Sequence, residues 1–205
     1  MATLSERDAH AWQSLAERIS ATLHPRLGRG VLANRTFFEA SSRQRLGPAL
    51  DKARHASAAL TACSEVVIRT DVRAFYPSVN PSIAFQALGA LQVDSEVASG
   101  TAEMLERWGS EGYPGLPIGP PGSAVIANAI LHEVDTRLEP LPHLRWVDDY
   151  LIGLLRAREV SGILDRLDSA LEHVGLERSG PKTTVLTGGR GFTWPGTYRG
   201  FRSSE

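Results

Sequence analysis

The stretch Trp146-Val147-Asp148-Asp149-Tyr150 constrains the fold of this chain more than any other. Apolar residues flank the two adjacent carboxylates on both sides, which predicts two short strands joined by a tight turn. Two like charges side by side repel each other, and near a buried sheet they also lose hydration. A divalent cation such as Mg²⁺, which prefers carboxylate oxygens, relieves both costs. The alternative is a solvated turn, because Asp is a common turn residue.

The composition indicates one soluble globular domain, with or without a small subdomain. The chain has 205 residues, of which 42% are hydrophobic and 22% are charged. No apolar run approaches the ~20 residues of a membrane span, and the N-terminus lacks the pattern of a signal peptide. The single cysteine, Cys63, excludes an intramolecular disulfide and a cysteine-rich zinc site. We therefore expect a cytoplasmic protein that does not bind membranes.

Basic residues are concentrated in one part of an otherwise neutral sequence. The net charge is −1, which is not a general nucleic-acid signature. Between residues 26 and 54, however, seven basic residues stand against two acidic ones. Such a segment can form a phosphate-facing patch. The alternative is a solvated arginine-rich surface.

The order of the expected elements predicts an α+β architecture. A β-branched run at 66–72 predicts a buried strand that ends near Asp71, and residues 185–186 predict a short one. Gly175 is a candidate left-handed cap after the last helix. We expect helices to cover one face of a small antiparallel sheet. The expected helices cover 5–23, 81–91, 94–108, 123–138 and 159–174, with a short one after Pro48.

Asp71 gives the Asp-Asp turn a partner. A strand that ends at Asp71, beside a hairpin that carries Asp148 and Asp149, brings three carboxylates together. Such a cluster can hold two Mg²⁺ ions about 3.5–4 Å apart, the arrangement used for in-line displacement at phosphorus. Three acidic positions are common in any sequence, so the segments around them decide the interpretation.

Four segments in order resemble the palm motifs of reverse transcriptases. The first has an Asp followed by two aromatic residues, and the second is a Gly-Leu-Pro loop followed by Ser123 and Asn128. The third is an aromatic-x-Asp-Asp hairpin, and the fourth carries a lysine after Gly175. In this sequence they read Asp71-Val72-Arg73-Ala74-Phe75-Tyr76, Gly115-Leu116-Pro117-Ile118-Gly119, Trp146-Val147-Asp148-Asp149 and Pro181-Lys182-Thr183.

The resemblance implies catalytic and metal-binding roles. Asp71 and Asp148 match the metal ligands of the family, together with the backbone of Val72. Asp149 matches the second hairpin carboxylate, a lesser contributor to the metal site. Lys182 matches a lysine near the departing pyrophosphate, where a cation would stabilise developing charge.

The resemblance also implies a nucleotide site. Tyr76 matches the aromatic residue that packs under the sugar and excludes a 2′-hydroxyl. Arg suits bidentate phosphate binding, so Arg35, Arg43 and Arg45 are candidates for triphosphate contacts. The second motif matches the loop that supports the templating base and the primer end. The nucleotide-binding set that we predict is Tyr76, Phe75, Arg35, Gly115, Leu116, Pro117, Gly119 and Ser123.

The chain departs from the family pattern in two residues and in extent. Ile118 stands in place of the usual Gln, and Trp146 in place of the usual Tyr. The Leu-Pro-Ile-Gly-Pro version of the loop is most similar to abortive-infection and defence-associated reverse transcriptases of bacteria. We expect a reduced fingers-like region at 1–60, a palm at 61–205 and no separate thumb. Residues 194–201 are a candidate remnant of the primer-grip hairpin.

The implied function is DNA synthesis directed by RNA, with dNTPs as substrates and Mg²⁺ or Mn²⁺ as the cofactor. A template and primer would be partners, and a noncoding RNA or a partner protein could supply a thumb. The alternative is a catalytically weak or inactive subunit that binds nucleic acid or a protein. An RNA-dependent RNA polymerase is a third interpretation, against which Tyr76 and the Gly-Leu-Pro loop argue.

Overall fold

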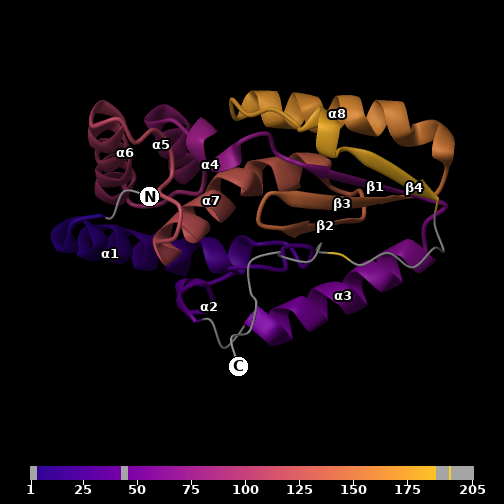
Figure 1. The fold of residues 1–205 in the computed structure, drawn as a ribbon, viewed down its shortest axis with the longest axis horizontal. Helices are drawn as coiled ribbons and strands as arrows, with labels where there is room; N and C mark the ends of the chain where they lie inside the picture. Colours follow the sequence, from indigo (N-terminus) through magenta and orange to yellow (C-terminus); the bar gives the residue numbers. More distant parts are fainter. Residues whose placement is uncertain (1–3, 43–45, 188–193, 195–205) are drawn as a thin grey trace.

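A small antiparallel sheet occupies the right-hand half of the molecule in Figure 1, which shows a computed structural model. The structure describes residues 4–42, 46–187 and 194. In this part of the chain the sheet has four strands in the order β2-β3-β1-β4. The strands are β1 (Val66–Asp71), β2 (His143–Trp146), β3 (Asp149–Leu154) and β4 (Thr184–Thr187). The expected α+β palm-like fold is confirmed.

Helices make up most of the remaining described residues. In the described chain, none is long and apolar enough to span a bilayer. Those longer than one turn are α1 (Glu6–Leu23), α2 (Phe37–Ser41), α3 (Leu46–Ala62), α4 (Phe75–Ser78), α5 (Pro81–Ala90), α6 (Ser95–Ser110), α7 (Pro121–Leu138) and α8 (Val160–His173). Single 3₁₀ turns are η1 (His24–Arg26), η3 (Ala157–Glu159) and η4 (Gly180–Lys182).

Helix boundaries follow the capping residues in the sequence. Ser5 accepts a hydrogen bond from the backbone N–H of Asp8 at the start of α1, and Asn80 does the same for Ile83 before α5. Gly175 follows the end of α8 and has φ +67°, the left-handed conformation expected of a helix cap. The segment after Pro48 differs from the short helix that we expected, because α3 runs for 17 residues. Its alanine-rich sequence favours helix throughout.

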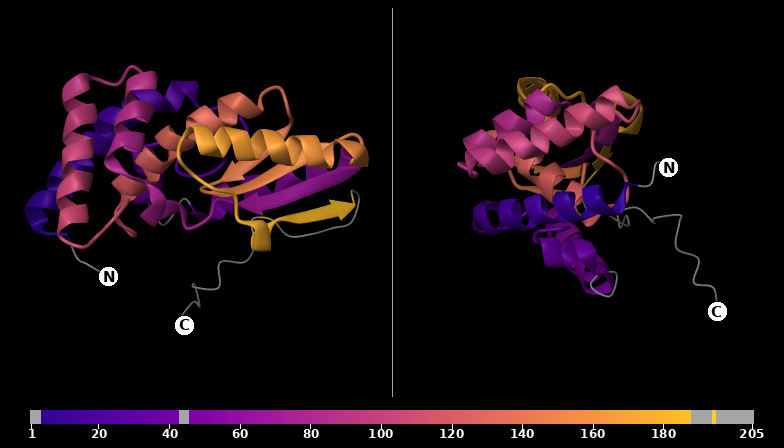
Figure 2. Two further views of the ribbon diagram at one scale, coloured as in Figure 1. Left: turned by 90° about the horizontal axis from the view of Figure 1, so that it is seen from above. Right: turned by 90° about the vertical axis from the view of Figure 1, so that its left-hand side faces the viewer.

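The larger core lies on one face of the sheet. Ile68, Tyr150 and Ile152 point into it from β1 and β3, and each is fully buried. α7 and α8 pack against each other over this face, and α1, α5 and α6 extend the helical layer beyond the sheet (Figures 1 and 2). The alternation of strand side chains therefore gives the sheet one buried face, which is mainly apolar but also carries Arg145 opposite Tyr150.

α3 crosses the opposite face of the sheet (Figure 1). Val67 and Leu151 form a second apolar cluster there with Trp146 and residues of α3. A Cβ at Gly153 would lie 2.8 Å from a methyl group of Leu60, so glycine allows α3 to approach the sheet closely. α3 thus adds a partial layer to the expected architecture, in contact with β2 and β3.

The N-terminal region is attached to both the core and the hairpin. α1 packs on α7, and a Cβ at Gly122 would lie 2.8 Å from the ring of Trp12. Residues 30–32 run along the outer edge of β2, where Arg145 N–H donates to the Gly30 carbonyl at 2.8 Å. This segment covers what would otherwise be an open sheet edge. The division at residue 60 stays a prediction, since α1 shares the main core.

Gly115 joins the second motif to the first. Leu116 N–H donates to the carbonyl oxygen of Tyr76 at 2.8 Å. A Cβ on Gly115 would lie 2.1 Å from this oxygen and 2.6 Å from Cα of Pro77. The φ of Gly115 is +80°, which also favours glycine. Backbone contact between the two motifs therefore requires glycine at this position.

We expect Gly115→Ala to destabilise the fold by about 2–4 kcal/mol, because a backbone clash adds to the cost of a positive φ. Gly112→Ala is the matched control, since Gly112 has φ +91° but open space around its Cβ position. The control should cost only about 1 kcal/mol. Urea unfolding measures both values, and equal losses would contradict the close contact.

Candidate active site

Strand register brings the predicted carboxylates to one end of the sheet. In the β1–β3 pair, Asp71 lies directly opposite Asp149. Asp148 occupies the turn between β2 and β3, and its carbonyl accepts a hydrogen bond from Val72 N–H at 3.2 Å. The strand and the hairpin thus meet as the sequence predicted, and they carry Asp71, Asp148 and Asp149 on neighbouring backbone positions.

The turn that carries Asp148 has an unusual backbone. Val147 has φ +58°, a conformation that costs a β-branched residue about 1–3 kcal/mol. The guanidinium of Arg145 donates to the Val147 carbonyl at 2.9 Å, and the adjacent Trp146 is buried in the second cluster. These contacts hold the turn in place, since nothing in its local sequence favours this φ.

Two basic side chains of the protein pair with the carboxylates of Asp71 and Asp149. Arg69 donates to Asp149 from Nη2 at 3.0 Å and from Nε at 3.4 Å. Lys182 Nζ lies 2.9 Å from Oδ1 of Asp71. Among the described residues, Asp148 forms no ion pair within 4.0 Å. Asp148 is therefore the carboxylate whose charge the chain compensates least.

Burial and neighbouring charge act on Asp148. Burial, and then the charge of Asp71, raise its pKa from an ordinary 3.8 to about 6, against a smaller opposing effect of Lys182. Burial also raises the pKa of Asp149, although Arg69 counteracts it. A further positive charge at this place would stabilise the ionised form of Asp148.

The residues present fit a hard divalent cation by their chemistry. All candidate donors are oxygens, from Asp71, Asp148, Asp149 and the backbone of Val72, and Mg²⁺ prefers such ligands. In the described part of the chain, no three acidic, histidine or cysteine side chains are grouped so that they could hold a metal ion. Asp71 instead pairs with Lys182, and Asp149 pairs with Arg69.

The fourth motif places Lys182 by running along the end of β1. Ser179 N–H donates to the Asp71 carbonyl at 2.7 Å, and Arg73 N–H donates to the Glu177 carbonyl at 2.7 Å. The Lys182 side chain is 66% exposed, so only its ammonium group is fixed, by Asp71. Hydrogen bonding to Asp71 raises the pKa of Lys182. The structure thus brings Lys182 to Asp71, while its predicted role beside a departing pyrophosphate stays a prediction.

The two aromatic residues of the first motif have different environments. Phe75 is buried in the main core, whereas Tyr76 is half-buried at its edge. Their rings lie 5.5 Å apart in an edge-to-face arrangement. In the second motif, Leu116 is buried, while Gly119 is exposed with φ +116°. The predicted contacts of Pro117 and Gly119 with a nucleic acid stay predictions.

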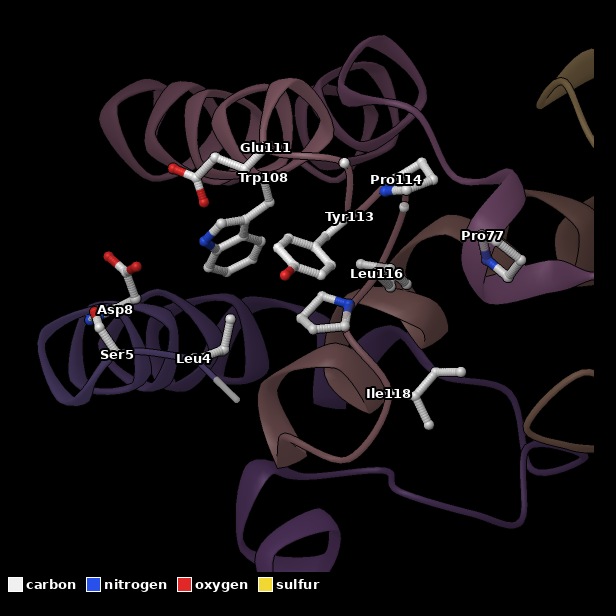
Figure 3. A pocket seen from close by; sticks show the side chains of 13 residues that line it. Leu4, Ser5, Asp8, Pro77, Trp108, Glu111, Tyr113, Pro114, Leu116 and Ile118 are labelled. Atoms are coloured by element: carbon white, nitrogen blue, oxygen red, sulfur yellow. Dashed lines mark hydrogen bonds between the residues drawn. The ribbon is translucent and has the colours of Figure 1, made fainter. Parts of the chain in front are cut away.

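An apolar hollow of about 440 Å³ lies beside loop 115–119 (Figure 3). The rings of Trp108 and Tyr113 form one side of it, facing the start of α1. The carboxylates of Asp8 and Glu111 lie at its edge near Trp108. This combination suits an apolar group better than a phosphate.

Arg35 is held by the backbone of its own loop. Its guanidinium donates to the carbonyls of Leu27, Gly28 and Val31 at 2.6–2.9 Å. Arg35 also lines a cavity of about 470 Å³ with Lys52 and Trp146. Glu39 lines the cavity too, so this cavity, called the basic cavity below, has two cationic side chains and one carboxylate. The contact of Arg35 with a triphosphate stays a prediction. Arg43 and Arg45 lie outside the described residues, as does the segment 195–201 of the expected primer-grip remnant.

Ser123 lies inside the protein instead of facing a ligand. Its side chain is 1% exposed, and its Oγ accepts a hydrogen bond from the Trp12 indole at 3.2 Å. This position favours a packing role between α1 and α7. The contact of Ser123 with a nucleotide, which we predicted from the motif, would require the hydroxyl to leave this partner.

The sequence interpretation missed a buried polar network under the hairpin. Arg145 is fully buried, and its guanidinium donates to both carboxylate oxygens of Asp135. It also donates to Oδ1 of Asn128 at 2.6 Å, while Tyr150 donates to Asp135 at 3.1 Å. For Arg145 the available signal was a charged residue between the apolar residues Leu144 and Trp146. Asp135 offered no such signal, because Glu133 and Arg137 are charged as well. Buried charges of this kind are retained only when they are paired.

Comparison with protein families agrees with this geometry. Residues 14–199 match the family described as "Reverse transcriptase (RNA-dependent DNA polymerase)". This range includes the carboxylates, the second-motif loop and Lys182. A search of curated proteins finds no match. The chain therefore belongs to the reverse transcriptase family.

Proposed function

We propose that this protein is an RNA-directed DNA polymerase that extends a primer with dNTPs. The observation that carries the proposal is the meeting of Asp71, Asp148 and Asp149 at one end of the sheet, beside Lys182. A protein that only binds nucleic acid has no need for clustered carboxylates, which repel both each other and phosphate.

The proposed reaction is nucleotidyl transfer. The 3′-hydroxyl oxygen of the primer attacks the α-phosphorus of a dNTP, and a new O–P bond forms. The bond between the α-phosphorus and the bridging oxygen breaks, and pyrophosphate leaves with the electron pair. The hydroxyl proton passes to solvent. Asp71 and Asp148, with the Val72 carbonyl, would hold Mg²⁺ there, and the metal would lower the pKa of the hydroxyl and neutralise phosphate charge.

Lys182 is proposed to serve the leaving group. Its ammonium now neutralises Asp71, and its exposed side chain can turn from this carboxylate to a phosphate oxygen. A cation at that place stabilises the charge that develops on pyrophosphate. Arg69 remains on Asp149 and reduces the repulsion between the three carboxylates.

Nucleotide selection is proposed to depend on the half-buried Tyr76. Phe75 packs edge-to-face against its ring, and the Gly115 loop holds its backbone carbonyl. A ring fixed in this way would meet a 2′-hydroxyl and exclude ribonucleotides. The basic cavity lined by Arg35 and Lys52 is the proposed place of the triphosphate. Loop 115–119 is the proposed support of the template.

The biological role that we propose is antiviral defence in bacteria. It is supported only by the Leu-Pro-Ile-Gly-Pro loop and its similarity to defence-associated reverse transcriptases. A noncoding RNA or a partner protein would then supply the duplex-binding surface that a thumb usually provides.

A specific observation favours a second candidate, a catalytically weak subunit with a polymerase-like palm. Lys182 and Arg69 of the chain itself pair with Asp71 and Asp149. Such pairing can be structural, and the protein would then bind nucleic acid or a partner without catalysis. Binding of divalent metal to the carboxylates distinguishes the two candidates.

We expect Asp148→Asn to reduce primer extension with Mg²⁺ by more than about 100-fold. Loss of a metal ligand should cost more than the roughly 10–100-fold that follows loss of a residue hydrogen-bonded to such a ligand. Asp71→Asn should have the same effect. Asp51→Asn is the control, since Asp51 is an exposed carboxylate on α3. Equal extension by wild type and Asp148→Asn would contradict the assignment.

The raised pKa of Asp148 predicts that Asp148→Asn, which should lower activity, raises the stability of the fold. Between pH 3.8, the ordinary pKa of this carboxyl group, and pH of about 6, its pKa in the folded protein, Asp148 binds a proton in the folded state more than in the unfolded state. The stability from this group is complete below 3.8 and lost as pH rises through about 6. In metal-free buffer at pH 7.5, we expect Asp148→Asn to be more stable than wild type by about 1–3 kcal/mol.

This difference should shrink toward zero at pH 4, as followed by urea unfolding across the pH range. Asp51→Asn should show no such dependence. A stability gap that stayed constant between pH 4 and pH 7.5 would mean that Asp148 is not desolvated in the folded protein.

We expect Tyr76→Ala to reduce the preference for dNTPs over rNTPs by about 10–100-fold, because a single steric contact has this discriminating effect. Tyr113→Ala is the matched control, since Tyr113 lies exposed beside the apolar hollow. Single-nucleotide incorporation measures kcat/KM for each substrate. An unchanged preference in Tyr76→Ala would remove Tyr76 from the proposed nucleotide site.

A further inference from the structure

Two residues with left-handed backbone lie at the two ends of one buried hydrogen-bond chain. Asn34 has φ +53° in the N-terminal loop, and Val147 has φ +58° in the catalytic turn. The amide Nδ2 of Asn128 donates to the carbonyls of Ala33 at 3.0 Å and of Asn34 at 2.8 Å. Its Oδ1 accepts from Nη1 of Arg145 at 2.6 Å. The same Nη1 donates to the Val147 carbonyl at 2.9 Å.

Burial makes this chain of bonds obligatory. Arg145 is 0% exposed and Asn128 is 2% exposed, so water cannot replace a lost partner, and an unpaired group would carry its full desolvation cost. Asp135 holds Arg145 through Nε at 2.9 Å and through Nη2 at 2.6 Å. The guanidinium is therefore locked in one orientation, and Nη1 is left to face Asn128 and Val147.

The two ends of this hydrogen-bond chain, Asn34 and Val147, belong to two parts of the proposed site. Asn34, Arg35 and Trp146 all line the basic cavity proposed for the triphosphate. Val147 precedes Asp148, the least compensated carboxylate. Backbone bonds between residues 30–32 and Arg145 reinforce the same connection. The distance between the cavity and the carboxylates is thus set by buried polar contacts.

We propose that Asn128 and Arg145 are positioning residues, which hold the loop 33–35 and the turn 147–148 as one unit and so align the incoming nucleotide with the carboxylates. This proposal rests on the proposed polymerase function for its purpose. The coupling between the two segments does not depend on activity, however, and can be measured without it.

Hydrogen–deuterium exchange of the full chain tests the coupling with Asn128→Ala. We expect both segments, 30–36 and 144–150, to exchange about tenfold faster. Each loses a buried hydrogen bond, and the loss of one such bond favours local opening by about this factor. α6 should remain unchanged. Faster exchange in only one segment, or in neither, would overturn the proposal.

Thr101→Ala is the matched control for general destabilisation. Thr101 is fully buried, and its hydroxyl donates to the Val97 carbonyl at 2.7 Å within α6. This variant should lower Tm without changing exchange in segments 30–36 and 144–150. The same exchange pattern in Thr101→Ala would overturn the proposal, since the response would then reflect lost stability alone.

Asn128→Asp keeps the experiment decisive if the alanine variant does not fold. It retains the side-chain volume and the acceptor for Arg145, but it places a carboxylate oxygen against the carbonyls of Ala33 and Asn34. We expect segment 30–36 alone to exchange faster, because the hairpin keeps its partner. Unchanged exchange in segment 30–36 would overturn the proposal.

Kinetics separate this proposal from the proposed function. If wild type extends primers, Asn128→Asp should raise KM for dNTP about tenfold and change kcat by less than about threefold, as a loss confined to nucleotide positioning requires. An equal fall in kcat with unchanged KM would overturn the positioning role. An inactive wild type with coupled exchange would refute the polymerase assignment and leave the coupling intact.

Discussion

The pairing of β1 with β3 is the constraint on which the rest of the site depends. Its register sets Asp71 directly opposite Asp149 and leaves Asp148 in the adjoining turn. Like charges at opposed positions of a sheet destabilise it. Apolar contacts on the other face offset this cost, because Ile68 and Ile152 are fully buried there. The fold thus tolerates a repulsive cluster at the end of strands that its core holds in place.

Basic side chains of the protein reduce this repulsion, but to a different extent at each carboxylate. Arg69 on Asp149 is a structural pairing between neighbouring strands. Lys182 on Asp71 has an exposed side chain and comes from a segment that merely runs alongside β1. Asp148 forms no ion pair with any residue that the structure describes, and its pKa is raised. Among the described residues, Asp149 therefore has a fixed cationic partner, Asp71 has a partner that can move away, and Asp148 has no cationic partner. This arrangement suits a cation that binds and is released.

Local signals predicted the ends of α1, α5, α6, α7 and α8 to within two residues, as well as the hairpin and the strand of Asp71, because caps and apolar periodicity act over a few residues. They did not predict the 17-residue length of α3. Resemblance to the family added Lys182, whose partner Asp71 lies 111 residues away. The network around Arg145 was not predictable, since Asp135 and Asn128 become its partners only through packing of α7 on the sheet. For the same reason, the burial of Ser123 against Trp12 was hidden: a motif assigns residue types and spacing, and tertiary contacts decide which side chains stay accessible.

Calorimetric titration with Mn²⁺ at pH 7.5 tests the central claim, that the carboxylates form a divalent-metal site in competition with Lys182. Wild type should bind Mn²⁺, and Asp71→Asn should lose this binding. Lys182→Met should bind the metal about 3–10-fold more tightly, because removal of a competing cation returns the free energy of a partly exposed ion pair. Absence of binding in wild type, or binding that is unchanged in Asp71→Asn, would contradict the account and favour a non-catalytic subunit.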